Sequence, residues 1–189
     1  IFVEIMKRVA KFLKVLDIPN DKRKIHKEPM PMLGGLGIFF AFLLGYMLFA
    51  PKNNLMLSIL ISAFLIMLLG LFDDMTKSET PMPNKYKVIV QLVVAAIVVF
   101  YGGLELTKVS MFGITLKFNS VVAPILSMLI IVATINAINL IDGMDGLCAG
   151  ISSIYFLTIA IIGFMVNKFG GLDIILSLIM LGSTLGYLV

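Results

Sequence analysis

The chain has 189 residues, of which 60% are hydrophobic and 14% are charged, and its mean hydropathy is +1.07. Soluble domains contain about 45–50% apolar and about 25% charged residues, so this composition excludes a water-soluble globule and a disordered tail and predicts a protein of the lipid bilayer. The formal net charge is +4. The 15 Lys and Arg lie mostly between apolar runs, where they can bind anionic lipid headgroups or phosphate substrates. We therefore expect no nucleic-acid partner.

Residues 1–16 place several lysines and Arg8 along one stripe of a helix, opposite an apolar stripe. This pattern is typical of either the cytoplasmic end of a truncated first transmembrane helix or an interfacial helix that binds anionic lipid. The chain starts at Ile1 and stops at Val189 inside an apolar run. We therefore expect it to be a fragment of a longer protein.

Six further apolar runs approach the length of about 18 residues that crosses a hydrocarbon core about 30 Å thick. They predict an all-α fold, a polytopic transmembrane helix bundle that forms a single integral-membrane domain over residues 1–189. The third run is short and suits a tilted or partly interfacial segment. The predicted spans are residues 33–50, 55–72, 88–101, 121–139, 150–166 and 172–189.

The connections between spans alternate between the two sides of the membrane, and their charges predict which side is cytoplasmic. Residues 17–32, 73–87 and 140–149 hold seven Lys and Arg, whereas the other connections hold four. The positive-inside rule therefore assigns the first set to the cytoplasm. On the opposite side, the alternation within residues 102–120 suits either a small extracytoplasmic β-hairpin or a plain surface loop.

Two acidic pairs stand at the ends of predicted spans on the cytoplasmic side. Asp73 and Asp74 follow the second span, and Asp142 and Asp145 follow the fourth. An ionised group at bilayer depth costs about 2.5–3.5 kcal/mol, so these side chains should face an interface or a wet cavity. Carboxylates are preferred ligands of Mg²⁺, and a lysine such as Lys85 neutralises phosphate, so this set predicts a site that handles phosphate through a divalent cation. The simpler alternatives are a solvated helix end and a polar turn with Asp and Asn caps.

The second acidic pair lies in the segment NAINLIDGMDG at residues 136–146. In a continuous helix Asn136 and Asp145 would face opposite ways, whereas a break at Gly143 or Gly146 would let the polar side chains converge. Near the start of the first span, a pair of glycines at residues 34–35 either brings backbone close to a nucleotide or packs helices together.

Taken in chain order, four segments resemble the polyprenyl-phosphate N-acetylhexosamine-1-phosphate transferases of glycosyltransferase family 4. Within this family the chain looks most like the bacterial undecaprenyl-phosphate N-acetylglucosaminyl-1-phosphate transferases. The pattern N-x-x-N-x-x-D-G-x-D-G is highly specific, and the match covers essentially the whole chain. The matching segments are PNDKRKIH at 19–26, PMPMLGG at 29–35, the pair Asp73-Asp74, and NAINLIDGMDGL at 136–147.

The resemblance implies Mg²⁺-dependent transfer of N-acetylhexosamine 1-phosphate, with N-acetylglucosamine favoured, from a UDP-sugar to undecaprenyl phosphate, with release of UMP. It implies that the protein lies in the bacterial cytoplasmic membrane with its site facing the cytoplasm. It also implies that the reaction is the first membrane step in the synthesis of a glycopolymer such as teichoic acid or lipopolysaccharide. A dimer is usual for relatives and is therefore expected here. By analogy each candidate residue has a role. Asp73 and Asp74 would lie at the reacting phosphates, Asn139 would contact the metal, and Lys85 would contact a phosphate. Asp145, with Gly34 and Gly35, would recognise the uracil, and Asn136 and Asp142 would shape the nucleotide pocket.

The family usually carries a further Asp in a G-D-x-G-S segment and a later His-containing loop, and neither occurs in this sequence. We therefore expect the fragment alone to be inactive. A CDP-alcohol phosphotransferase is disfavoured because residue 150 is Gly where that pattern has Arg. The alternative from another class is a cation- or proton-coupled transporter, which would place its acids near the midplane rather than at span ends.

Overall fold

The computed structural model describes most of the chain, namely residues 34–76, 82–141, 146–167 and 171–188, together with Ile5 and the backbone of residues 16–17 and 30–31. Of the predicted amphipathic segment 1–16, only Ile5 and Leu16 fall within this part. Leu16–Asp17 (β1) and Met30–Pro31 (β2) form a short antiparallel pair.

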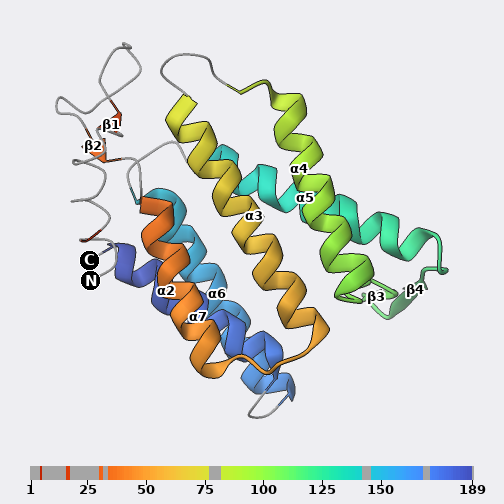
Figure 1. Cartoon of the computed structure of the whole chain (residues 1–189). Coiled ribbons are helices and arrows are strands. Elements are labelled where there is room, and N and C mark those ends of the chain that lie inside the picture. The colour runs from red at the N-terminus through yellow and green to blue at the C-terminus, as the bar shows by residue number, and fades with distance from the viewer. Residues whose placement is uncertain are drawn as a thin grey trace. The chain divides into compact units, whose positions relative to one another are not determined.

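The described chain is mainly helical (Figure 1). Each of the six predicted spans overlaps one helix, which confirms the all-α polytopic membrane fold. The elements are α2 (Gly34–Phe49), α3 (Asn54–Thr76), α4 (Asn84–Ala96) continued by η1 (Ile97–Tyr101), β3 (Lys108–Met111), β4 (Ile114–Lys117), α5 (Val122–Ile141), α6 (Leu147–Asn167) and α7 (Leu172–Leu188).

Four of these helices are long and apolar enough to cross a membrane: α3, α4 with η1, α5 and α6. The helices α2 and α7 are apolar but shorter. The third span starts at Asn84 rather than at the predicted residue 88, which gives it a length of 18 residues. The helix therefore includes the polar residues at its start, which a hydropathy criterion excludes.

The chain divides into two compact units. The first comprises Ile1–Ala50, Gly70–Pro81 and Met144–Val189, and the second comprises Pro51–Leu69 and Met82–Gly143. The helix α3 contributes its first part to the second unit and its last turns to the first.

In the first unit, glycines let α2 approach α7 closely. A Cβ atom added at Gly34 would lie 2.6 Å from Tyr187 Cε2, and one added at Gly45 would lie 2.7 Å from Ile179 Cγ2. The order of these contacts makes the two helices antiparallel. Because lipid is as apolar as a leucine side chain, close packing of this kind stabilises helix pairs in membranes.

A buried hydrogen bond joins α6 and α7 in the same unit. Ser153 Oγ donates to Thr184 Oγ1 at 2.8 Å, and both side chains are buried. Each hydroxyl group also bonds to its own helix, Ser153 to the carbonyl of Ala149 at 2.8 Å and Thr184 to that of Met180 at 3.0 Å, so the bond between them links the two helices through polar groups that are already paired.

In the second unit, α4 and η1 pack against α5 around small and branched apolar side chains. The turn η1 is wider than an α-helical turn, because Gly102 N donates to Ile97 O five residues earlier at 3.0 Å. Gly102 lies against α3: a Cβ atom there would be 2.3 Å from Ser58 Oγ and 2.4 Å from Val98 O. The unit's buried apolar residues are Met56, Val94, Ala95, Val98, Val99 and Ala123.

The strands β3 and β4 form an antiparallel hairpin between η1 and α5. The two residues of its turn both have positive φ, +50° at Phe112 and +79° at Gly113, as a type I′ hairpin turn requires. The predicted hairpin is confirmed, and its position on the outer side of the membrane stays a prediction.

We expect Gly102→Ala to destabilise the full-length protein by about 1–3 kcal/mol, because the added methyl group overlaps a backbone carbonyl that cannot move away. The matched control is Gly70→Ala in α3, where no described atom outside the helix's own backbone lies within 4 Å of the added Cβ. That change should leave stability unchanged or raise it by up to about 1 kcal/mol. Thermal unfolding in detergent measures both, and equal midpoints for the two variants would contradict the packing described at Gly102.

Candidate active site

The first acidic pair lies within a helix rather than after it. The helix α3 continues past the predicted end at residue 72 to Thr76, so Asp73 and Asp74 stand in its last turn, and both are half-buried. Thr76 Oγ1 donates to the carbonyl of Phe72 at 2.9 Å and so satisfies one of the terminal carbonyl groups. Two carboxylates at a helix C-terminus oppose the helix dipole, and a cation bound beside them would offset this repulsion.

The two candidate glycines differ in their surroundings. Gly34 is packed against Tyr187, whereas a Cβ atom added at Gly35 would meet no other side chain or loop of the described residues within 4 Å. Gly34 therefore serves helix packing in this structure, and Gly35 is the glycine whose backbone a ligand could approach. The first turn of α2 and the last turn of α3 belong to the same unit.

In the second unit, the candidate residue Asn136 is bound to a buried glutamine that sequence reasoning missed. Asn136 Nδ2 donates to Gln91 Oε1 at 2.7 Å and to the carbonyl of Val132 at 2.8 Å. Gln91 is 5% exposed, on the face of α4 that meets α5. A signal for it exists in the sequence, since it is a single amide in the apolar run that forms the third span, and polar residues inside such runs usually face a partner.

These two bonds determine what Asn136 can offer a ligand. An amide nitrogen has two hydrogens, and both are donated within the protein. The carbonyl of Val132 also fixes the orientation of the amide, because an oxygen in place of Nδ2 would face another acceptor. Asn136 therefore has only its oxygen, Oδ1, left for a ligand, and it can accept a hydrogen bond or coordinate a cation.

The second asparagine of the motif has a different environment. Asn139 is exposed, one helical turn beyond Asn136. Its amide can reach a ligand without first losing a buried partner. The N-x-x-N pattern therefore combines one internally bound amide with one exposed amide.

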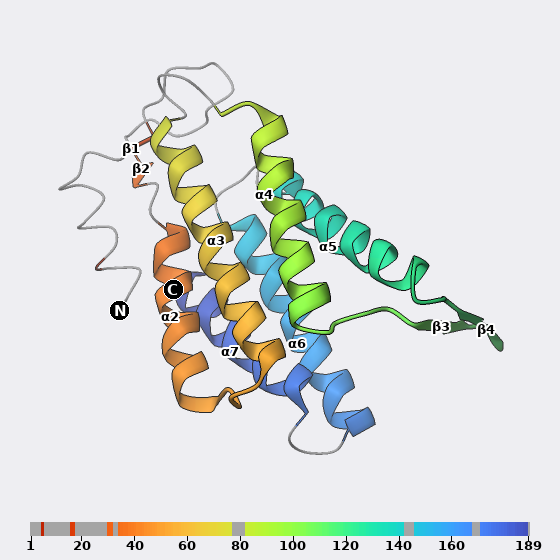
Figure 2. The ribbon, with the colours of Figure 1, turned by 45° about the vertical axis from the view of Figure 1, so that its right-hand side comes forward.

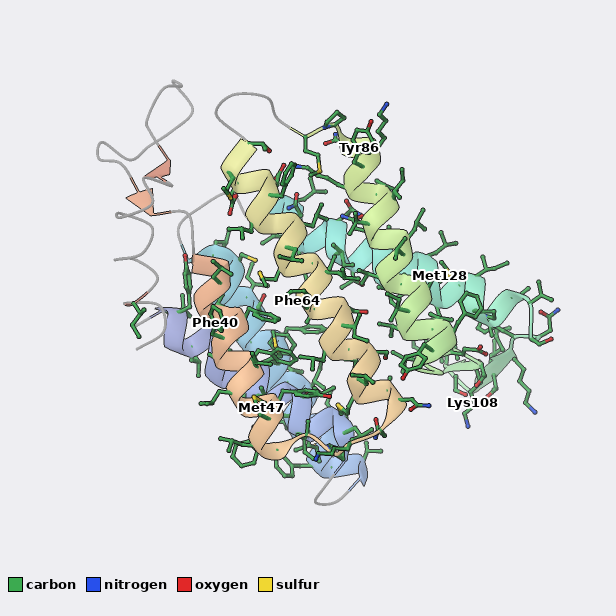
Figure 3. The ribbon with its side chains drawn as sticks, viewed as in Figure 1. Phe40, Met47, Phe64, Tyr86, Lys108 and Met128 are labelled. Atoms are coloured by element: carbon green, nitrogen blue, oxygen red, sulfur yellow. The ribbon has the colours of Figure 1, made fainter. Side chains whose placement is uncertain are left out.

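The basic candidate Lys85 lies at the exposed start of α4. Its Nζ atom is 5.1 Å from the ring centroid of Tyr86, which Figure 3 labels at that end of the helix. Lys87 is a second basic residue to consider, because it is half-buried and lies one turn before Gln91, so the two share a face of the helix. Sequence reasoning did not assign it to the site.

The predicted break in the motif at residues 136–146 is present. The helix α5 ends at Ile141, α6 begins at Leu147, and Gly146 has a φ of +75°, in the left-handed region that favours glycine. The candidates Asp142 and Asp145 lie outside the described residues, so their side chains are not placed.

The candidate residues are divided between the two units. Asp73, Asp74 and the two glycines belong to the first, whereas Lys85, Asn136 and Asn139 belong to the second, and convergence of the two sets stays a prediction. Within the described ranges, no group of three or more His, Cys, Asp and Glu side chains could hold a metal ion. The predicted donors are carboxylate and amide oxygens, which is the donor type that Mg²⁺ prefers together with substrate phosphates.

Comparison with known proteins gives consistent results. The family described as glycosyl transferase family 4 matches residues 56–189. A probable undecaprenyl-phosphate N-acetylglucosaminyl 1-phosphate transferase of Bacillus subtilis (strain 168) is 38% identical over 100% of this chain and 51% of its own length. An undecaprenyl-phosphate alpha-N-acetylglucosaminyl 1-phosphate transferase of Escherichia coli O157:H7 is 30% identical over 86% of this chain and 43% of its own.

A phospho-N-acetylmuramoyl-pentapeptide-transferase of Wolbachia pipientis wMel is also similar, with 30% identity over 78% of this chain and 48% of that protein. The chain thus spans about half the length of the curated relatives it matches. No solved structure matches it significantly. Bacterial relatives and apolar helices together indicate a bacterial membrane protein.

We expect Gln91→Met to destabilise the full-length protein by about 1–3 kcal/mol, because it leaves the Asn136 amide without its buried acceptor. Replacing both partners, as Gln91→Met with Asn136→Leu, should recover most of this loss, since two apolar side chains leave no unpaired group. Asn139→Leu, at the exposed amide one turn away, serves as the control. Added to Gln91→Met, it should change the free energy of unfolding little further, so its coupling to Gln91→Met should be close to zero. A double-mutant cycle on thermal unfolding measures the coupling, and additive effects at Gln91 and Asn136 would contradict the bond.

Proposed function

The chain belongs to glycosyl transferase family 4, and from this membership we propose that the full-length protein transfers an N-acetylhexosamine 1-phosphate from a UDP-sugar to undecaprenyl phosphate. The observation that carries the proposal is the 38% identity, over the whole chain, to a relative named for an undecaprenyl-phosphate sugar 1-phosphate transfer. Membership of a transferase family favours this function over the transporter alternative.

We propose N-acetylglucosamine as the sugar. Two relatives named for that sugar match at 38% and 30% identity. The relative described above that is named for a muramoyl-pentapeptide transfer is 30% identical, so the highest of these three identities is to a relative named for N-acetylglucosamine. The product would be a lipid-linked sugar that begins a cell-envelope glycopolymer such as teichoic acid or lipopolysaccharide. The charge distribution of the connections supports a site facing the cytoplasm, where UDP-sugars are made.

In the proposed reaction, an oxygen of the acceptor phosphate forms a bond to the sugar-linked phosphorus of the donor. The bond between that phosphorus and the bridging oxygen breaks, and UMP leaves with that oxygen. Positioning and electrostatic stabilisation dominate phosphoryl transfer of this kind. The protein therefore needs to hold two anionic substrates in line more than it needs a reactive side chain.

We propose that Asp73, Asp74 and Asn139 would hold Mg²⁺, which when bound neutralises charge on the donor's two phosphates. Lys85 would balance the charge of a substrate phosphate at the water boundary. Asn136 would present Oδ1 to the nucleotide pocket, in an orientation that Gln91 and Val132 maintain. The remaining assignments follow the family resemblance: Asp142 in the same pocket, and Asp145 with the backbone at Gly35 at the uracil, next to Gly34, which packs on Tyr187.

An assay of the full-length protein in detergent, with undecaprenyl phosphate and labelled UDP-N-acetylglucosamine, tests the proposed function. We expect lipid-linked product and UMP in equal amounts, both lost when Mg²⁺ is removed by a chelator. Ion flux in proteoliposomes without lipid-linked product would support the transporter instead.

We expect Asp73→Asn and Asp74→Asn each to lower turnover by about 100-fold or more, because each removes a charge that positions the reacting groups. Glu105→Gln is the matched control, since it removes an exposed carboxylate in the connection between η1 and β3. Its activity should equal that of the unchanged protein. Full activity in both aspartate variants would contradict their proposed role.

The pH dependence separates a positioning role of Asp74 from proton removal. A phosphate monoester loses its second proton with a pKa of about 6, so most acceptor is already a dianion at pH 7. If Asp74 only positions, activity should fall below that pKa in parallel in the unchanged protein and in Asp74→Asn. Activity of Asp74→Asn that is lost in acid but restored to the unchanged level at higher pH would show that the carboxylate removes the proton.

A further inference from the structure

The β3–β4 hairpin has one polar and one apolar face. In a strand pair, directly opposed residues share a face, and successive residues alternate between faces. The register Lys108 with Lys117 and Ser110 with Thr115 makes the polar face, on which the Ser110 and Thr115 hydroxyl groups are hydrogen-bonded at 2.8 Å. The apolar face consists of Val109, Met111, Ile114 and Leu116.

The apolar face is exposed. Relative exposures are 64% at Met111, 67% at Ile114 and 57% at Leu116, and Phe112 at the turn is 92% exposed. A two-stranded hairpin is at best marginally stable in water, and a contiguous exposed apolar surface usually marks a binding surface. The side chains on this face therefore need an apolar partner outside the chain.

The base of the hairpin is fixed to helices that are long enough to cross the membrane. Leu106 N donates to Ser127 Oγ of α5 at 2.7 Å, and this buried hydroxyl group in turn donates to Ala123 O at 2.8 Å. Asn119 Oδ1 accepts from the backbone N–H of Val122 and caps the first turn of α5. The hairpin is therefore held at the ends of two apolar helices, which is the level of the lipid headgroups.

The charges on the polar face suit the same location. Lys108 and Lys117 are directly opposed across the strands, and like charges in such a pair repel each other. Phosphate groups between or beside them would offset this repulsion. Figure 2 shows the hairpin extending sideways from the ends of α4 and α5, and Figure 3 labels Lys108 there.

We propose that the β3–β4 hairpin docks on the surface of the bilayer, with its apolar face and Phe112 at the boundary between headgroups and acyl chains and with Lys108 and Lys117 at the lipid phosphates. This is how amphipathic elements lie in the interface. A second copy of the chain fits less well, because the apolar face of a four-residue hairpin is much smaller than a stable dimer interface of about 1,000 Å². The proposal is independent of the enzymatic activity.

The 189 residues contain no Trp, so within them an introduced Trp reports on one position. We compare Leu116→Trp on the apolar face with its neighbour Thr115→Trp on the polar face. Each variant of the full-length protein is reconstituted in phosphatidylglycerol and phosphatidylethanolamine vesicles whose acyl chains are brominated near the headgroups. The fluorescence of the unchanged protein is subtracted as the background. Bromolipid should abolish most of the added emission of Leu116→Trp and little of that of Thr115→Trp.

Val109→Trp and Ser110→Trp repeat the comparison on the partner strand, in case one substitution prevents the hairpin from forming. Equal quenching of both faces, or no quenching of either, would overturn the proposal. A Leu116→Trp emission that bromolipid leaves unchanged, but that is shielded from acrylamide, would show that protein rather than lipid covers the face. Turnover of the same samples is a separate measurement, so a failure of the proposed enzymatic function would not be mistaken for a failure of docking.

Discussion

The structure depends on one constraint, which is that a polar group inside an apolar helix must have a partner or must reach a water boundary. Buried hydroxyl and amide groups meet it by bonding within the protein, as Ser153 does with Thr184 and Gln91 with Asn136. The half-buried carboxylates of Asp73 and Asp74 stand in the last turn of α3 rather than at its middle. The same rule therefore places both the helix contacts and the chemically useful side chains.

The pairing of Gln91 with Asn136 shows how packing and chemistry share residues. The bond joins residues 45 positions apart and holds α4 against α5. It also uses the donor capacity of Asn136 and leaves one acceptor atom, so the contact that stabilises the helix pair defines what the amide can bind. Asn139, one turn later and exposed, is not restricted in this way.

Hydropathy predicted the helices because each apolar run needs the internal hydrogen bonds of a helix in lipid. It misplaced the start of α4 and the end of α3, because a helix continues through polar residues that the apolar count excludes. It could not find Gln91 as a partner, since a contact between distant helices leaves no periodic pattern within either. It also could not separate Gly34, which packs on Tyr187, from Gly35, because that difference depends on a side chain at the far end of the chain.

Hairpin docking would bear on the site through the length of one helix. The continuous helix Asn84–Tyr101 has 18 residues and is about 27 Å long at 1.5 Å per residue, close to the hydrocarbon thickness of about 30 Å. Lys85 is at its start, and the chain enters the hairpin after its end. If the hairpin rests on one boundary, the helix length sets Lys85 at the other, where a phosphate in water and a phosphate on a lipid can both reach it. An anchor on one face would thus fix the depth of the basic candidate on the opposite face without contacting it.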